Sequence, residues 1–191
     1  MTEAEVKEIF VAAGAIMEGH FLLTSGLHSP MYVEKFNVLQ HPKSTEKLCK
    51  ALAEQFKNEK IQTVVGPMTG GILLAHEVGK ALGTRAIFTE RENGRMTFKR
   101  GFSLQPGERV LIVEDIVTTG GSVKEVIDVV RENGGVPVAV GMLVDRSGGK
   151  VSFGDVPYHA LLHLDVVTYD PKDCPLCEKG TPMTKRGRTG K

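Results

Sequence analysis

The chain has 191 residues, of which 41% are hydrophobic and 25% are charged, and its formal net charge is +1. This composition is typical of a globular domain long enough for one complete α/β core. It argues against a nucleic-acid-binding protein, whose body would be strongly basic, and no apolar run is long enough to span a membrane. The first residues do not resemble a signal peptide and the three cysteines do not suggest a disulfide framework, so we expect a cytoplasmic protein.

The N-terminal part of the chain predicts one helix followed by extended segments. A capping-box pattern that starts at Thr2, with an apolar stripe at helical spacing, predicts a helix that ends near Gly14. Residues 15–24 and 31–36 are predicted to be strands, with a turn-rich segment between them. Lys35 falls in the second of these strands, where a surface position is the ordinary one for a lysine.

A predicted helix over residues 42–57 precedes a strand-to-helix unit with a glycine-rich turn. The unit consists of a strand, 61–65, the turn 66–71 and a helix, 72–82. Backbone N–H groups at a helix N-terminus bind anions, so this turn is a candidate anion site. Taken alone the evidence is weak, because many turns of this kind contain glycine.

A predicted strand over residues 85–90 leads into a basic segment, 91–101. Asn93-Gly94 within it is a strong signal for a hairpin turn. The segment holds a single acid, and its cations are Arg91, Arg95, Lys99 and Arg100. One interpretation is a solvated hairpin with a charged face, and the other is a loop that binds an anionic ligand.

The most informative stretch runs from residue 109 to residue 133. Four apolar residues, 110–113, predict a strand buried in a parallel sheet, and Glu114 and Asp115 follow where that strand is predicted to end. A turn of Thr, Gly and Ser, 118–122, then leads into an amphipathic helix that a glycine pair ends.

This order of elements predicts a site for a ribose 5-phosphate. Glycines let successive N–H groups converge at the start of the helix, and the hydroxyl groups add further donors, which suits a phosphate. The turn has neither the Gly-Lys-Ser/Thr ending of a Walker loop nor the spaced glycines of a dinucleotide-binding loop. The two carboxylates would repel a phosphate, but they can accept hydrogen bonds from sugar hydroxyls.

Beyond this helix, a β-rich run over residues 136–144 is followed closely by Arg146. The carboxyl end of a parallel strand is where open α/β sheets bind ligands, and the planar fork of arginine suits a carboxylate. Residues 159–167 are predicted to be the last strand, in which His159 and His163 are expected to be ordinary strand residues rather than metal ligands.

The C-terminal residues contain a lone Cys-x-x-Cys pair, Cys174 and Cys177. Zinc needs two further ligands, and Cys49 is distant in sequence, so the pair predicts no metal site. From residue 171 onward the chain has six basic and two acidic residues, and we expect 171–191 to be a basic, flexible tail.

Residues 110–122, Val-Leu-Ile-Val-Glu-Asp-Ile-Val-Thr-Thr-Gly-Gly-Ser, resemble the phosphoribosyl-pyrophosphate signature of the type I phosphoribosyltransferases. The resemblance implies that the acid pair holds the ribose hydroxyls, that the turn holds the 5-phosphate, and that the turn 66–71 contacts pyrophosphate. The residues that it implies in binding phosphoribosyl pyrophosphate are Glu114, Asp115, Ile116, Val117, Thr118, Thr119, Gly120, Gly121, Ser122, Thr69 and Gly70.

The segment Leu23-Thr-Ser-Gly-Leu-His-Ser-Pro-Met-Tyr32 is similar to an N-terminal element of the orotate-specific members of this family, where it forms part of a hood over the base. This similarity implies transfer of the phosphoribosyl group to orotate in pyrimidine synthesis, with Lys35, Thr118 and Arg146 contacting orotate. Many of these members have a lysine in the turn that corresponds to 66–71. This chain has none there, so backbone and hydroxyl groups would serve instead.

In the same family, the basic loop before the signature strand closes over pyrophosphate and reaches the site of a neighbouring subunit. We therefore favour the ligand-binding interpretation of the basic segment, and Arg91, Lys99 and Arg100 join Glu114 and Asp115 as candidate catalytic residues. The family also implies a Mg²⁺ ion held mainly through substrate, and a homodimer that exchanges this loop between its active sites.

Together these patterns predict an α/β fold with a central, mainly parallel sheet between flanking helices. We expect a single phosphoribosyltransferase domain, 1–170, with a small hood over about 1–40 and a core over about 41–170. Two other functions stay open: transfer to another base such as a purine, and regulatory binding of phosphoribosyl pyrophosphate without turnover. Arg146 argues against a purine, which has no carboxylate, and the intact acid pair argues against a protein without activity.

Overall fold

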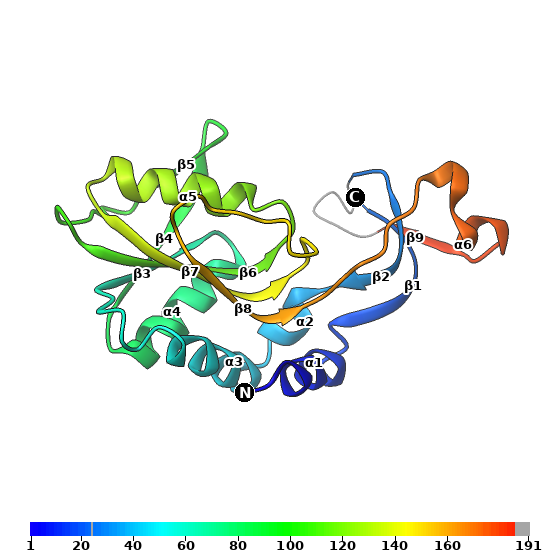
Figure 1. Ribbon diagram of the computed structural model, residues 1–191, viewed down its shortest axis with the longest axis horizontal. Coiled ribbons are helices and arrows are strands. Elements are labelled where there is room, and N and C mark those ends of the chain that lie inside the picture. The colour runs from blue at the N-terminus through cyan, green and yellow to red at the C-terminus, as the bar shows by residue number, and fades with distance from the viewer. Residues whose placement is uncertain (24, 186–191) are drawn as a thin grey trace.

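A six-stranded sheet with the strand order β5-β4-β3-β6-β7-β8 forms the centre of the computed structural model, which describes residues 1–23 and 25–185 (Figure 1). The β4–β5 pair is an antiparallel hairpin, and the other four pairings in this sheet are parallel. The strands are β3 (Thr63–Pro67), β4 (Arg85–Glu92), β5 (Arg95–Phe98), β6 (Arg109–Val117), β7 (Val136–Asp145) and β8 (Tyr158–His163). The prediction of a central, mainly parallel sheet is confirmed.

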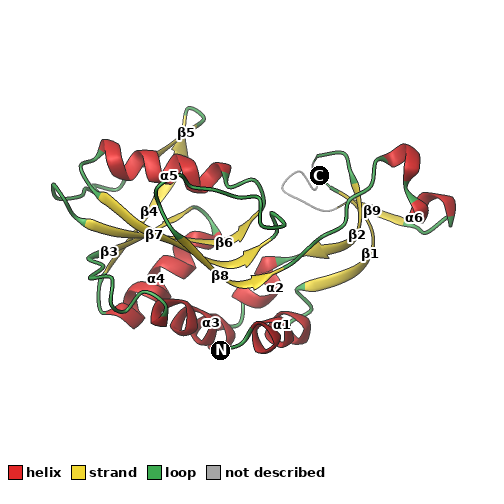
Figure 2. Ribbon diagram, viewed as in Figure 1, coloured by secondary structure: helices red, strands yellow, loops and turns green. Residues whose placement is uncertain are grey.

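Helices cover both faces of this sheet (Figure 2). One face carries α1 (Glu3–Ala12), α2 (Lys35–Leu39), α3 (Pro42–Glu54) and α4 (Gly70–Leu82), and the other carries α5 (Gly121–Glu132). Within the described residues, no helix is both long enough and apolar enough to span a membrane.

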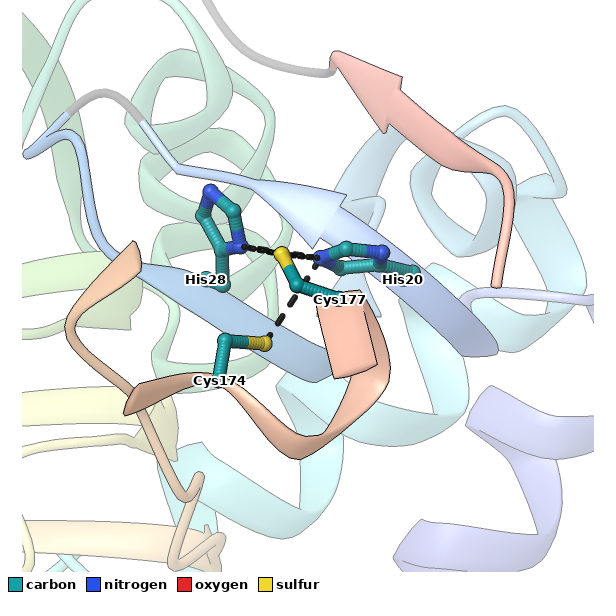
Figure 3. Close-up of side chains that lie close together, drawn as sticks. All are labelled: His20, His28, Cys174 and Cys177. Atoms are coloured by element: carbon teal, nitrogen blue, oxygen red, sulfur yellow. Dashed lines mark hydrogen bonds between the residues drawn. The ribbon is translucent and has the colours of Figure 1, made fainter. Parts of the chain in front are cut away.

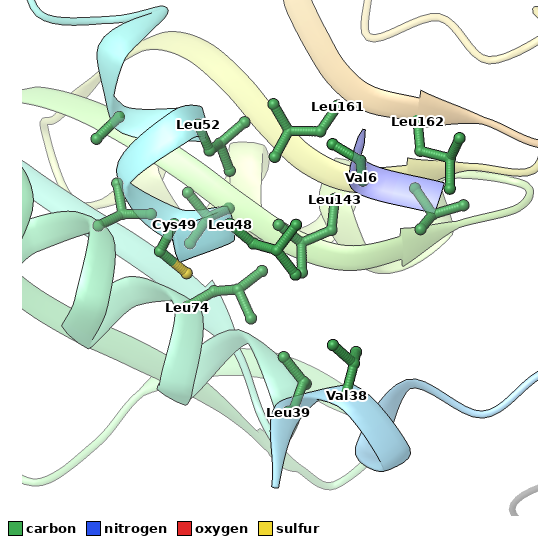
Figure 4. Close-up of a cluster of buried hydrophobic side chains, with 14 of the residues drawn as sticks. Val6, Val38, Leu39, Leu48, Cys49, Leu52, Leu74, Leu143, Leu161 and Leu162 are labelled. Atoms are coloured by element: carbon green, nitrogen blue, oxygen red, sulfur yellow. The ribbon is translucent and has the colours of Figure 1, made fainter. Parts of the chain in front are cut away.

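Strand β6 shows why the sheet is buried on both sides. Leu111 and Val113 pack into the apolar cluster beneath α1, α3 and α4, part of which Figure 4 shows. Val110 and Ile112 point to the opposite face and pack into the cluster beneath α5. Successive side chains of a strand alternate between faces, so a continuous apolar run serves both clusters.

A second, three-stranded sheet with the order β2-β1-β9 forms the hood beside the core (Figure 1). Its strands are β1 (Ile16–Leu22), β2 (His28–Val33) and β9 (Met183–Lys185). Strands β1 and β2 are antiparallel, and β9 pairs with β1 in parallel. The C-terminal segment reaches β9 through a 3₁₀ turn, Pro171–Asp173, and a short helix, α6 (Pro175–Glu178).

The C-terminal segment differs from the flexible tail that its composition suggested. Residues 171–185 contain a 3₁₀ turn, a short helix and a strand, and β9 extends the hood sheet through the register His20↔Met183 to Leu22↔Lys185. Backbone pairing of this kind requires no particular side chains, which is why composition did not indicate it. The rest of the predicted tail, 186–191, lies outside the described residues.

Three predicted boundaries were wrong. Strand β6 does not end before the acid pair, because its ladder with β7 continues to Val117. Lys35 is the first residue of α2 rather than a strand residue, and the Glu34 carboxylate caps that helix by accepting a hydrogen bond from the Phe36 N–H. The last core strand ends at His163, after which the chain leaves the sheet edge toward the hood.

Two local predictions, the capping box at Thr2 and the hairpin turn at Asn93-Gly94, are confirmed. The capping box at Thr2 is present, since its hydroxyl accepts from the Glu5 N–H while the Glu5 carboxylate accepts from the Thr2 N–H. The Asn93-Gly94 turn closes the β4–β5 hairpin, in which Glu92 faces Arg95.

Candidate active site

A cleft of about 960 Å³ lies between the hood and the carboxyl ends of the core strands. The hood contributes Ser25 and Tyr32 to its lining. Many residues predicted from the sequence meet here although they come from four separate segments. They are Lys35, Thr69, Glu114, Asp115, Ile116, Thr118, Thr119, Ser122 and Arg146.

Asp115 is the best-anchored side chain of the cleft. It is 1% exposed, and the Lys35 ammonium lies 2.9 Å from its Oδ1 and 2.8 Å from its Oδ2. The Ile116 N–H also donates to Oδ1, at 2.7 Å. Lysine and backbone together fix the orientation of this carboxylate, which is what a group that positions a sugar hydroxyl requires.

Glu114 is buried beside Asp115 but has no comparable cation. Its Oε1 accepts a hydrogen bond from the Asp115 N–H at 2.9 Å. Burial, together with the negative charge of Asp115, raises the pKa of Glu114 from 4.5 to about 8. Burial also raises the pKa of Asp115, and the Lys35 charge works in the opposite direction. At neutral pH the raised pKa of Glu114 favours its protonated form, whereas Lys35 supports the charge of Asp115.

The turn after β6 forms a separate hollow of about 80 Å³ at the N-terminus of α5. Its lining includes Val117, Gly120 and Gly121, together with the hydroxyl-bearing residues of the turn. Gly120 has φ of 76°, and a Cβ there would lie 2.7 Å from Val151 Cγ2. Glycine is thus required at this position for both conformation and space, and the first N–H groups of α5 are left to bind an anion.

The glycine-rich turn after β3 packs directly against the acid pair. A Cβ on Gly70 would lie only 1.8 Å from Asp115 Oδ2, so Gly70 permits the contact between this turn and the carboxylate. Helix α4 begins at Gly70, two residues earlier than predicted. Thr69 lines the cleft from this turn, and the cation nearest to the acid pair is Lys35 from the hood side.

Arg146 lines the same cleft as the acid pair and follows directly after β7. Its backbone N–H donates to the Val117 carbonyl at 2.8 Å, which ties the residue to the end of β6. Burial lowers the pKa of the guanidinium below its usual value. Its Nε is buried and has no hydrogen-bond partner among the residues that the structure describes. A buried donor without a partner indicates a place for an acceptor such as a carboxylate.

The predicted catalytic cations of the hairpin do not line the cleft of their own chain. Arg91 pairs with Glu125 at 2.7 Å, Lys99 with Glu92 at 2.8 Å, and Arg100 with Glu90 at 2.7 Å. The Arg100 guanidinium lowers the pKa of Glu90. In this chain the basic segment contains a hairpin, and acids pair with these three of its four cations.

One wall of the cleft consists of residues that were not predicted from the sequence. Residues 165–168, which connect the core to the hood, contribute Asp165, Val166 and Thr168, and Lys150 lies on the same side. No sequence motif indicates these residues. They reach the cleft only because the chain passes from the end of β8 back to the hood.

A divalent cation would find few protein ligands here. Among the described residues, the cleft holds no group of three or more close His, Cys, Asp or Glu side chains. The acid pair is the nearest candidate, and Lys35 already occupies Asp115. A Mg²⁺ ion at this place would take most of its oxygen ligands from substrate and water.

An anion hollow beside an acid pair at the carboxyl edge of a parallel sheet defines a class of phosphoribosyl-transferring proteins, and comparison with known families agrees. Residues 36–152 match the phosphoribosyl transferase domain, so the chain belongs to this family. Within the family it falls among the orotate phosphoribosyltransferases. It is 56% identical over 187 residues to the orotate phosphoribosyltransferase of Desulforamulus reducens, an alignment that covers 98% of this chain and 97% of the relative.

Solved structures show the same fold. The orotate phosphoribosyltransferase of Aeropyrum pernix matches with a TM-score of 0.69 at 26% identity, covering 83% of this chain and 93% of that one. That of Mycobacterium tuberculosis, in complex with inorganic phosphate, matches with a TM-score of 0.68 at 25% identity, covering 85% and 95%.

Proposed function

We propose that the protein transfers the 5-phosphoribosyl group of phosphoribosyl pyrophosphate to orotate, giving orotidine 5′-phosphate and pyrophosphate. The observation that carries this proposal is a cleft lined by an anchored carboxylate and by an arginine with an unpaired buried donor, which shares lining residues with the anion hollow. Each of these three features matches one part of the two substrates: the 5-phosphate, the ribose hydroxyls and the orotate carboxylate.

The 5-phosphate is assigned to residues 118–122. The hydroxyl groups of this turn and the first N–H groups of α5 surround the hollow, and the helix dipole favours negative charge there. Among the described residues, Glu114 is the one carboxyl group that lines this hollow, and a protonated Glu114 would not repel the phosphate.

The ribose is assigned to the acid pair. Asp115 accepts hydrogen bonds from the hydroxyls, and Lys35 keeps its carboxylate charged and correctly turned. Departure of pyrophosphate leaves positive charge on the ribose ring, which a nearby carboxylate stabilises. The protein contributes mainly position and electrostatics, because it forms no covalent bond with the ribose in this scheme.

Orotate is assigned to the wall formed by Arg146 and the hood. The guanidinium can hold the orotate carboxylate through two parallel hydrogen bonds. The Lys35 side chain is 34% exposed, so its ammonium can approach the base while it holds Asp115. The backbone near Thr118 lies on the same rim of the cleft.

Mg²⁺, a second subunit and a cytoplasmic location complete the proposal. Mg²⁺, held mainly through substrate, would offset the negative charge of pyrophosphate. Arg91, Lys99 and Arg100 would act on pyrophosphate in the partner subunit of a homodimer, which agrees with their position outside the lining of their own cleft. The cysteines Cys49, Cys174 and Cys177 are not paired in disulfides, as is usual in a reducing compartment.

Phosphorus NMR tests this reaction. Phosphoribosyl pyrophosphate, Mg²⁺ and the protein should give pyrophosphate and one nucleotide phosphate signal only after orotate is added. Pyrophosphate release that does not depend on orotate would contradict the proposal, and so would tight binding without any conversion.

A further inference from the structure

Four metal-ligating side chains that are far apart in sequence meet at the hood, away from the cleft (Figure 3). They are His20 on β1, His28 at the start of β2, and Cys174 and Cys177 at α6. The sequence predicted no metal at the Cys-x-x-Cys pair because a second pair of ligands was lacking. The structure brings two histidines to that pair from about 150 residues upstream.

Three of the separations between ligand atoms match those around one tetrahedral zinc ion, and a fourth is shorter. Zn–N bonds of about 2.0–2.1 Å and Zn–S bonds of about 2.3 Å place neighbouring ligand atoms about 3.3–3.8 Å apart. Here His20 Nε2 lies 3.8 Å from each sulfur, Cys177 Sγ lies 3.3 Å from His28 Nδ1, and the two histidine nitrogens are 2.9 Å apart. All four ligand atoms lie within 4.8 Å of one another.

The surroundings of His20 also favour a metal ligand. Its Nδ1 lies 2.8 Å from the Thr181 carbonyl oxygen, so Nδ1 carries the proton and donates it. Nε2 then carries a lone pair that can bind a metal, and the other three ligand atoms lie within 3.8 Å of it. A histidine that donates its other ring N–H to a carbonyl is the usual arrangement around protein-bound zinc.

The burial of polar side chains in this cluster also favours a bound metal ion. His20, His28 and Cys174 are each no more than 5% exposed, so two imidazole rings and a thiol have been removed from water at the edge of a small sheet. Two thiolates and two imidazoles form a ligand set that selects zinc over magnesium or calcium.

We propose that His20, His28, Cys174 and Cys177 bind one structural Zn²⁺ ion that fastens the C-terminal segment to the hood. Two ligands come from the β1–β2 hairpin and two from the segment that leads into β9. The ion would therefore connect two parts of the hood that are otherwise joined in this sheet by the short β1–β9 pairing. Strand β9 has only three residues, and such short pairings are weak without a further constraint.

The ion would also act on the cleft. The backbone of the proposed ligand His28 is bonded to that of Tyr169. The His28 N–H donates to the Tyr169 carbonyl at 2.9 Å, and the Tyr169 N–H donates to the His28 carbonyl at 2.8 Å. One residue further, the Ser29 hydroxyl donates to the Val167 carbonyl at 3.1 Å. These bonds position residues 165–168, which form the cleft wall described above. Loss of the metal should therefore loosen this wall as well as the hood.

The test measures metal content in the full chain, purified without chelator or histidine tag. Elemental analysis should find about one zinc per chain. After removal of zinc under reducing conditions, added Co²⁺ should give the visible absorption bands and the thiolate-to-metal band of a tetrahedral sulfur–nitrogen site. Adding a chelator to the zinc form should lower the midpoint of thermal unfolding.

Variants assign the ligands. Cys174→Ser, Cys177→Ser and His20→Gln should lose zinc and the cobalt spectrum, and their unfolding midpoints should no longer respond to chelator. Matched controls are Cys49→Ala, a core cysteine outside the cluster, and His76→Gln, an exposed histidine on α4, both of which should keep the metal.

Unmodified protein that contains no zinc and, when fully reduced, binds neither Zn²⁺ nor Co²⁺ would overturn the proposal. This result does not depend on whether any variant folds. Metal binding that survives in both cysteine variants would overturn it equally, because the ion would then be held elsewhere.

Discussion

The Lys35 ammonium lies within 2.9 Å of both carboxylate oxygens of Asp115, although 80 residues separate the two in sequence. This ion pair joins the first helix after the hood to the signature strand of the core. The Asp115 side chain is almost fully enclosed, so loss of Lys35 would leave a carboxylate charge with little access to water. The pair therefore links the position of the hood to the orientation of the group assigned to the ribose.

Replacement of Asp115 by Asn should lower kcat by at least about 100-fold, a loss typical of removing one preorganised group that stabilises transition-state charge. The amide keeps the shape of the side chain but carries no charge toward the ribose. Circular dichroism and thermal unfolding should show a folded protein. Near-normal turnover in this variant would remove Asp115 from the ribose site.

Replacement of Glu114 by Gln should change the pH dependence of stability. Folding raises the pKa of Glu114 from 4.5 to about 8, so between these values the folded state holds a proton that the unfolded state releases. Stability therefore falls as pH rises through this window and is lowest, for this group, above pH 8. The Gln variant should lack this part of the decline and unfold at least about 2–4 °C higher than the parent at alkaline pH. An unchanged slope across the window would contradict the raised pKa.

Replacement of Arg146 by Lys should raise the KM for orotate by about tenfold or more, because lysine cannot form the two parallel hydrogen bonds of the guanidinium. The KM for phosphoribosyl pyrophosphate should change much less. Arg109→Lys is the matched control, since Arg109 is at the opposite end of β6 and donates to the Glu59 carbonyl. Equal effects on the two KM values would argue against a specific contact with orotate.

Subunit mixing tests the proposed exchange of the basic hairpin. A Lys99→Ala/Arg100→Ala variant and the Asp115→Asn variant should each have little activity alone. If the hairpin acts in the partner's cleft, each mixed dimer contains one intact site, and random mixing restores about a quarter of the parental activity. If the hairpin acts in its own cleft, mixing restores none, and a monomer by sedimentation would exclude exchange altogether.

The parts of the fold that depend on local pattern could be predicted from the sequence. The apolar run of β6, the glycine-rich turn after it and the periodic helix α5 adjoin one another, so the anion hollow follows from neighbours in the chain. The acid pair was found for the same reason, although its strand extends further than its apolar residues, because pairing with β7 continues past them.

The parts of the fold that depend on contacts between segments far apart in sequence could not be predicted. Nothing near Lys35 indicates that Asp115 will be its partner, since that contact arises only when the hood folds against the core. Strand β9 was hidden in a polar, basic segment because its pairing uses backbone atoms. The cluster of His20, His28, Cys174 and Cys177 could not be predicted for a further reason. Cys174 and Cys177 are an incomplete ligand set until two β-strands bring histidines to them.

Loss of orotate absorbance after addition of phosphoribosyl pyrophosphate and Mg²⁺ tests the central assignment most directly, with adenine, hypoxanthine and uracil assayed in parallel. We predict turnover of orotate alone, and only in samples that contain Mg²⁺. Turnover of a purine instead of orotate would leave the ribose site in place but contradict the role of Arg146. Binding of phosphoribosyl pyrophosphate without turnover of any base would contradict the enzymatic function itself.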